Sequence, residues 1–446
     1  MATVNLPVVL PKCNSLLILG CLFLELLGNA AILPPPGDTL LVSSLANGGP
    51  GSLRQAIDDN NALGGGRRIL FSNTVTGEIA ITATLEINAD TVIVGPGAKL
   101  LTLNANSTNR VFHITDVAVS LSGLTIANGY SDSGGGILSV ATYPMLKIEK
   151  CIFRNNMARI NGGAVQSASA ALIVDSAFLE NSAASVGGAL FALDGAAVTN
   201  CTFVGNSATS AATGRGGAIF ALNASGSSYL YSCTIVSNTA GVSGGGVDQG
   251  SPLVHIGNSI VAWNSAPSAP DTAGFFFSQG YNLIGNSTSS TGWATALGDQ
   301  LGSDSLPLNP TLGALQDNGG PTPTLAPQPG SPAIDKGRTW AGAADQRGRR
   351  RPYDNADVAN ASGGDGSDIG AVEVSLPPRL AVDRAGANVV LSWASYYADF
   401  VLERTAALGA SSNWAPSPAP HYLIGDRWNV TNATAGTTEW FRLRSQ

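Results

Sequence analysis

The sequence predicts an all-β protein built as a right-handed parallel β-helix, a solenoid of short stacked strands. Two observations predict this fold class. The composition is turn-rich, with 54 glycines among 446 residues, 12% charged and 44% hydrophobic residues, which is too apolar for a disordered chain and too poor in charge for a helical one. The second observation is a repeat: the segment "CIFRNNMARINGGAV" from Cys151 recurs downstream with similar spacing, as the coils of a solenoid do.

Columns of like residues define the repeat, counted from Cys151, Ser176, Cys201, Cys233 and Ser259 as position zero. Position +2 is apolar in every copy: Phe153, Phe178, Phe203, Ile235 and Val261. Position −3 is also apolar: Ile148, Ile173, Val198, Leu230 and Ile256. Apolar residues at zero and +2 predict a strand with one buried face. Because position −3 breaks this alternation, we assign it to a preceding strand, with a bend between the two.

Position +5 is asparagine in every copy: Asn156, Asn181, Asn206, Asn238 and Asn264. In parallel coils roughly 4.8 Å apart, each Asn amide can hydrogen-bond to the Asn of the next coil, which predicts a structural ladder at a buried corner. The Gly-Gly that follows suits a corner needing positive φ or close backbone approach. An earlier copy, "GLTIANGYSDSGGG" from Gly123, places Asn128 in this column. A leucine-rich repeat also carries such an Asn, but its leucine scaffold is lacking.

The cysteines at position zero, Cys151, Cys201 and Cys233, are expected to be buried thiols of the core, together with the Phe column. An odd number of cysteines in one column does not suit a disulfide framework. Without a CxxC pair or clustered His residues, no zinc site is expected.

The columns and the composition divide the chain into five expected regions. These are a signal peptide (1–30), an N-terminal cap (31–66), β-helix coils (67–266), an irregular segment covering the C-terminal end of the solenoid (267–376) and a small β-sandwich domain (377–446). The signal peptide is predicted from an apolar run that ends at Leu27 and from small residues up to Ala30. A lipoprotein signal ending at Cys21 is the alternative. We expect no transmembrane segment in the mature chain.

The N-terminal cap is expected to contain a short helix over "SLRQAIDDNNAL". Ser52 and Gln55 match a capping box. The apolar stripe that would cover the first coil is a set of four residues: Leu53, Ala56, Ile57 and Leu63.

Several motifs together resemble secreted β-helix proteins of the choice-of-anchor Q type. They are "GPGSLRQAI", the repeats, "GSPAIDKG" with Asp335, "DQRGRRRP" from Asp345 and "DIGAVE" from Asp368, spanning roughly residues 40–374. The repeats are similar to those of polymorphic outer membrane proteins. The resemblance implies export and a secreted or cell-surface location. Two departures are Gly51 and Gln55, where a Cys and a Glu are often found, and we expect no autotransporter barrel or terminal anchor.

The charge pattern bears on partners and on catalysis. A net charge of −7 argues against nucleic acid and anionic membranes, which are bound by basic patches; the one basic cluster, Arg347 with Arg349 to Arg351, is short. Parallel β-helices also host pectate lyases and glycosidases, which need carboxylates gathered on one face. The acids within the repeats fall at different offsets from position zero: Asp175, Glu180, Asp194 and Asp248. We therefore assign no catalytic residue.

Two other sets of residues are weighed as ligand sites. Aromatic residues after the repeats could stack on sugar rings, or instead close the open end of the apolar core: Phe275, Phe276, Phe277, Tyr281 and Trp293. Four acids could bind Ca²⁺ but lack the spacing of a known calcium loop: Asp354, Asp357, Asp365 and Asp368. A polar, Gly-rich loop is the preferred interpretation, so no cofactor or metal is expected. His255 is expected at an outward strand position.

These observations predict a secreted or cell-surface, non-catalytic protein for adhesion, display or binding of a carbohydrate or another surface. A polysaccharide-degrading enzyme, pectate lyase-like or glycoside hydrolase-like, is the alternative. We expect a monomer whose partner is a polysaccharide or another cell surface.

Overall fold

The computed structural model describes residues 38–140, 146–224, 226–251, 253–340, 342–355, 357–374, 379–394, 400–409, 413–425, 427–433 and 438–445. The predicted signal peptide and the alternative at Cys21 lie outside these residues. The described residues form two compact units: unit 1 holds residues up to 353 together with 360–374, and unit 2 holds 354–359 and the residues after 374.

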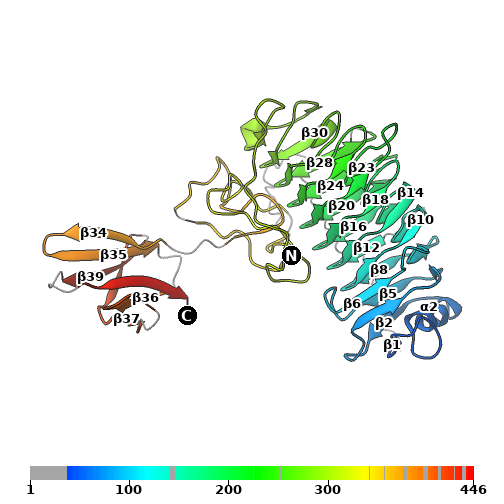
Figure 1. The fold of residues 1–446 in the computed structure, drawn as a ribbon, viewed down its shortest axis with the longest axis horizontal. Helices are drawn as coiled ribbons and strands as arrows, with labels where there is room; N and C mark the ends of the chain where they lie inside the picture. The colour runs from blue at the N-terminus through cyan, green and yellow to red at the C-terminus, as the bar shows by residue number, and fades with distance from the viewer. Residues whose placement is uncertain are drawn as a thin grey trace, which may run out of the picture. The chain divides into compact units, whose positions relative to one another are not determined.

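Unit 1 is a parallel β-solenoid, which confirms the predicted fold class (Figure 1). Sheet A contains β1 (Thr39–Val42), β2 (Arg67–Phe71), β5 (Thr91–Val94), β8 (Val119–Ser122), β12 (Leu146–Glu149), β16 (Ala171–Val174), β20 (Ala196–Thr199), β24 (Ser228–Tyr231), β28 (Val254–Gly257) and β30 (Thr272–Gly280). Sheet B contains β3 (Gly77–Ala80), β6 (Leu101–Asn104), β9 (Thr125–Ala127), β13 (Ile152–Arg154), β17 (Ala177–Leu179), β21 (Thr202–Val204), β25 (Thr234–Val236), β29 (Ile260–Ala262), β31 (Leu283–Ile284) and β33 (Gln300–Leu301).

Two further ladders complete each coil. Sheet C contains β4 (Leu85–Ile87), β7 (Phe112–Ile114), β11 (Ile137–Ser139), β15 (Val165–Ser167), β19 (Leu190–Ala192), β23 (Ile219–Ala221) and β27 (Val247–Gln249), and it ends on β30. Sheet D contains β10 (Tyr130–Ser133), β14 (Met157–Asn161), β18 (Ser182–Ala183), β22 (Ser207–Ala208) and β26 (Thr239–Ala240). Position −3 lies in sheet A and position +2 in sheet B, so the predicted bend separates them.

Residues in the left-handed conformation make the corners of each coil. Position −1, polar in every copy, turns the chain from sheet A to sheet B: Lys150, Asp175, Asn200, Ser232 and Asn258 have φ between 51° and 54°. The first glycine of each Gly-Gly has positive φ, as in Gly187 at 64°, while the second packs close to neighbouring coils. A Cβ on Gly188 would lie 2.1 Å from the carbonyl oxygen of Gly217. The pair therefore combines both reasons for glycine.

The core is a stack of like side chains. The rings of Phe153, Phe178 and Phe203 are parallel, with centroids 4.8 and 4.6 Å apart. Cys151, Cys201 and Cys233 are buried free thiols. Burial raises the pKa of the Cys151 thiol to about 12, because the thiolate would be desolvated.

The asparagine column forms a hydrogen-bonded ladder. The side-chain amides of Asn156, Asn181, Asn206 and Asn238 each donate to Oδ1 of the next Asn, at 2.8 to 2.9 Å. Asn128 does not belong to this column. β9 pairs with β13 so that Ala127 lies beside Arg154, which puts Gly129 beside Asn156, and the Gly129 N–H donates to Asn156 Oδ1. Asn128 instead occupies a left-handed corner, with φ of 53°.

The N-terminal cap contains α2 (Leu53–Ala62), as the stripe predicts. The Ser52 hydroxyl accepts a hydrogen bond from the Gln55 N–H, but the Gln55 side chain donates to Asp59 rather than back to the cap. Leu53, Ala56 and Ile57 are buried, whereas Leu63 is 59% exposed. Assigning Leu63 to the stripe was wrong because the helix ends at the preceding residue.

The solenoid continues beyond the expected end at residue 266. β30 pairs with β27 and β28, β32 (Ser290–Thr291) pairs with β30, and a 3-10 helix, η1 (Thr295–Leu297), precedes β33. Trp293 and Leu301 pack against the core at this end. The repeat fades here in sequence, but the coil geometry does not.

Residues 302–353 and 360–374, which we call the strap, lie beside the coils (yellow in Figure 1) rather than over their C-terminal end. The strap meets the outer face of sheet B. The Thr202 hydroxyl donates to Gln346 Oε1, and the Ala371 N–H donates to the Thr234 hydroxyl. A second apolar cluster joins sheet B to the strap: Val236, Ile260, Ala262, Leu283, Leu325, Ala333 and Ile369. Position +1 faces outward and is apolar or Thr, so it needs this cover.

Unit 2 is a separate domain of two antiparallel sheets. One contains β34 (Ala381–Ala385), β35 (Asn388–Ala394), β39 (Arg427–Ala433) and β38 (His421–Ile424), and the other contains β37 (Ala415–Pro416), β36 (Phe400–Thr405) and β40 (Trp440–Ser445). Leu402 from one sheet and Trp393 from the other line the same pocket, so the sheets face each other as in a sandwich.

Candidate functional site: a groove on sheet A

A groove of about 360 Å³ lies between the outer face of sheet A and a segment of the strap. Its lining comes from three strands, two corners and the strap: Lys147, Glu149, Leu172, Val174, Asp175, Thr199, Asn200 and residues 342–344. We call it the sheet A groove. Its volume falls in the range of small-molecule sites.

Strand alternation positions the floor. In β12, β16 and β20 the residues at position −3 point into the core, so their neighbours on either side point outward. Leu172 and Val174 thus lie beside Lys147 and Glu149 of the preceding coil, and Thr199 lies beside Val174. The floor is apolar in the middle and polar at both ends.

The left-handed corners bring Asp175 and Asn200 to the rim. The Asn200 amide donates to Asp175 Oδ1 at 3.3 Å and to the carbonyl oxygen of Ala344 at 3.0 Å. Asn200 therefore connects the corner to the strap wall. Two nearby oxygens have no hydrogen-bond partner among the described residues, namely Asn200 Oδ1 and Thr199 Oγ1. These residues are only 6% and 5% exposed, and a buried polar atom without a partner is costly.

The pKa values of the two carboxylates in the groove are shifted in opposite directions. Burial raises the pKa of Asp175 to about 6, although the Asn200 hydrogen bond and the Lys150 charge oppose the shift. Burial also acts to raise the pKa of Glu149, but hydrogen bonds from Lys150 and Lys147, at 2.7 and 3.0 Å, outweigh it and lower the pKa. Asp175 therefore takes up a proton at a higher pH than Glu149 does.

An aromatic row follows on the outer face of the later coils. Tyr229 stacks on His255 at 4.8 Å between centroids, and His255 stacks on Phe277 at 5.0 Å. His255 thus takes an outward strand position, and its burial lowers its pKa. Because these rings cover one another's faces, they present mainly edges to solvent. Beside Thr199 in register, Tyr231 stacks on Trp340 of the strap at 6.2 Å.

The five aromatics predicted as ligand contacts do not form one surface. Phe276 is fully buried and stacks on Trp293 at 5.1 Å. Tyr281 is also buried, and its hydroxyl donates to the carbonyl oxygen of Ser362. Phe275 is 42% exposed and meets Phe277 edge-on. Phe276 and Trp293 therefore close the end of the core, the other use considered for these aromatics, because β30 continues the solenoid. Tyr281 follows β30, and its hydroxyl reaches the strap.

The four acids considered as calcium ligands are divided between the units. Asp354 and Asp357 belong to unit 2, and Asp365 and Asp368 to unit 1. Asp368 is buried, and its carboxylate accepts hydrogen bonds from the backbone N–H groups of Asp335 and Val374. In the described part of the chain no three His, Cys, Asp or Glu side chains group as a metal site. A polar, Gly-rich loop stays the prediction for these residues, with calcium binding as the alternative.

Two of the four arginines of the basic cluster, Arg347 and Arg351, are internal to the strap, whereas Arg349 and Arg350 are exposed. Arg347 pairs with Asp345 at 2.7 Å, and Arg351 pairs with Glu373 at 3.1 Å, all four side chains being at most 5% exposed. Arg351 also donates to the carbonyl oxygens of Asp368 and Gly370. The sequence motifs around these residues therefore hold the strap together.

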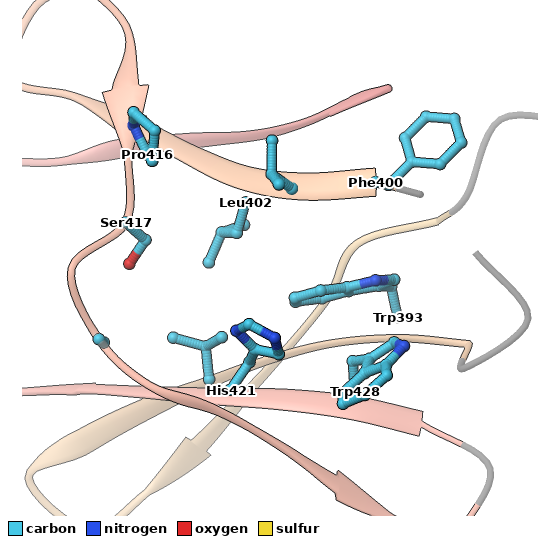
Figure 2. A pocket seen from close by; sticks show the side chains of 10 residues that line it. Trp393, Phe400, Leu402, Pro416, Ser417, His421 and Trp428 are labelled. Atoms are coloured by element: carbon cyan, nitrogen blue, oxygen red, sulfur yellow. The ribbon is translucent and has the colours of Figure 1, made fainter. Parts of the chain in front are cut away.

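Unit 2 has a smaller pocket of about 220 Å³ between its sheets. Figure 2 shows Trp393, Phe400, Leu402, His421 and Trp428 around it. The lining is mostly apolar, as expected for the interior of a sandwich that is not tightly closed.

Lys147, Glu149 and the strap wall are not among the residues that the sequence singles out. Glu149 occupies position −2 and Asp175 position −1, so their offsets differ, yet the left-handed corner brings both to one groove. The outward parity of β12 and β16 is the signal that could have identified Lys147 and Glu149.

A comparison with protein families matches residues 200–222 to the Chlamydia polymorphic membrane protein (Chlamydia_PMP) repeat. The match begins at the Asn200 corner and extends through β21 and β22 to β23. It covers a single coil, and with the parallel solenoid it fits a β-helix with repeats of this type. No curated protein matches the chain. In the described residues, no helix is both long enough and apolar enough to cross a membrane.

Proposed function

We propose that this protein is exported and displayed at the cell surface, where the solenoid acts as a non-catalytic adhesin that holds a carbohydrate or another surface. The coil that resembles the polymorphic membrane protein repeat supports the surface location. The resemblance of the motifs to choice-of-anchor Q proteins supports export.

The observation that carries the adhesive role is the sheet A groove. It is a concave site on a rigid scaffold, with an apolar floor and polar groups that converge on it. Binding sites on regular strands are held in place more firmly than sites on loops. The stacked core and the Asn ladder supply that rigidity.

Polysaccharide cleavage is the second candidate, and one observation favours it. Glu149 and Asp175 both line the groove, and their pKa values are shifted apart, as in sites that pair an ionised carboxylate with a proton donor. However, Glu149 is held by two lysines, which suits a structural carboxylate equally well.

The test is to incubate the full chain with plant, algal and microbial polysaccharides, and to measure both retained protein and released sugar. Retention without release supports the adhesin. Released sugar that disappears in Asp175→Asn would replace the adhesin with a glycosidase or lyase. If the chain is not retained and no sugar is released, carbohydrate adhesion is contradicted. Labelling of intact cells with an antibody tests the surface location separately.

A further inference from the structure

We propose that the sheet A groove is a binding site for a neutral sugar unit, recognised through Thr199 and Asn200. This inference rests on the proposed adhesive function and names its site and ligand class. The first step concerns the hydrogen-bonding groups of the groove. Asn200 Oδ1 can only accept hydrogen bonds, and the Thr199 hydroxyl can accept or donate. Neither oxygen has a partner among the described residues, so both are suited to ligand hydroxyl groups.

The second step is the position of these oxygens. The Asn200 side chain is already fixed through its amide, which donates to Ala344 and Asp175. The bond to Asp175 lies within the coils, so it still orients the Asn200 oxygen when the strap segment moves, which lowers the entropy cost of binding. Both oxygens lie beneath the groove surface, so contact requires a small outward shift of residues 342–344 or rotation of Thr199.

The third step is charge. Glu149, Asp175 and Lys147 line the groove, and Lys150 lies beside Glu149. Both lysines are paired with Glu149, so their charge is partly neutralised before a ligand arrives. The near-balance of charge favours an uncharged polyhydroxyl ligand over an anionic or cationic one.

The fourth step is the floor. Val174, with the small exposed edge of Leu172, offers an apolar surface against which the C–H face of a pyranose can pack. The polar groups lie at the edge of that surface, as the hydroxyl groups lie around a sugar ring. The same pairing of an apolar floor with convergent polar groups is typical of small-molecule sites.

The experiment is isothermal titration calorimetry of the full chain with neutral hexasaccharides of glucose, mannose or galactose, and with hexamers of galacturonate and glucosamine. We expect one of the neutral series to bind and the charged hexamers to bind at least about tenfold more weakly. Thr199→Val and Asn200→Gly should each weaken binding by roughly tenfold, from the loss of one or two hydrogen bonds. Glycine keeps the left-handed corner at Asn200, where φ is 51°.

Thr102→Val is the matched control, because Thr102 is a half-buried hydroxyl on β6 of sheet B, outside the groove. It should leave binding unchanged, and circular dichroism should show all three variants folded. Equal binding by the wild-type protein, Thr199→Val and Asn200→Gly would overturn the groove as the site, while polysaccharide retention would still uphold adhesion. Tighter binding of galacturonate would overturn the ligand class. If no polysaccharide retains the protein, both the groove as a sugar site and carbohydrate adhesion are contradicted.

Discussion

Asn264 donates both its backbone N–H and its side-chain amide to Oδ1 of Asp271, at 3.0 and 2.8 Å. Asp271 thus occupies the place that the next asparagine takes in the rest of the ladder. The solenoid ends its Asn column on a carboxylate, and the carboxylate is buried. Burial raises the pKa of Asp271 to about 6, even though the hydrogen bonds from Asn264 oppose the shift.

This raised pKa predicts a pH dependence of stability. Between about pH 4 and pH 6 the folded protein retains a proton on Asp271 that the unfolded chain has lost, so the free energy of unfolding falls as pH rises. Asp271→Asn should remove this component, which is on the order of 1 to 3 kcal/mol. Urea unfolding at several pH values measures it. Asp58→Asn, an exposed change on α2, is the control. Parallel pH curves for the wild-type protein and Asp271→Asn would contradict the prediction.

The ladder itself should be sensitive to truncation in its middle. Asn206 accepts from the N–H and side-chain amide of Asn181, and donates to Phe178 and Asn238. Asn206→Ala leaves several of these buried groups unpaired, so we expect a loss of roughly 3 to 5 kcal/mol in the free energy of unfolding. Asn73→Ala, at an exposed position, should cost less than about 0.5 kcal/mol. Similar melting temperatures for the two variants would show that the ladder contributes little.

Substitution of Gly188 tests the cost of close packing separately from the cost of a left-handed backbone conformation. Its φ is not positive, yet a Cβ there would lie 2.1 Å from the Gly217 carbonyl oxygen. Gly188→Ala should therefore cost more than about 3 kcal/mol, because backbone atoms must move. Gly348→Ala is the matched case: φ is 81° but nothing lies within 4 Å of the added Cβ, so only about 1 to 2 kcal/mol of backbone strain is expected. Thermal unfolding that ranks Gly348→Ala as the more damaging change would refute the packing argument.

The solenoid was predictable because its constraints are local and repeated. Position +5 is Asn in five successive coils, since each amide is both donor and acceptor, and the column is visible in the sequence without a structure. The same logic failed at Asn128. There the coil lacks its ladder Asn, and an Asn one position earlier, in the left-handed corner, imitates it.

The strap and the groove were not predictable, because their contacts join residues far apart without any period. Asn200 meets Ala344, and Thr202 meets Gln346, each across 144 positions. No alternation or spacing in residues 302–374 indicates which coils they cover. The wall of the sheet A groove comes from this segment, so the groove could not be inferred from the strands alone.

The stability of the strap should depend on its buried ion pairs rather than on its exposed ones. Removing Glu373 leaves the Arg351 guanidinium, which is 1% exposed, without its charge partner, and such a change typically costs about 3 to 5 kcal/mol. We expect Glu373→Ala to loosen the strap while the stacked coils stay folded, because the core cluster of the solenoid contains no strap residue. Hydrogen exchange should then accelerate in residues 345–353 and 360–374 and in the strands of sheet B that the strap covers.

Lys99→Ala is the matched control, since Lys99 joins the coils to the strap through an exposed pair with Asp317 at 2.6 Å, and such a pair is worth only about 0 to 1 kcal/mol. Uniform exchange throughout the solenoid in Glu373→Ala would mean instead that coils and strap unfold as one unit.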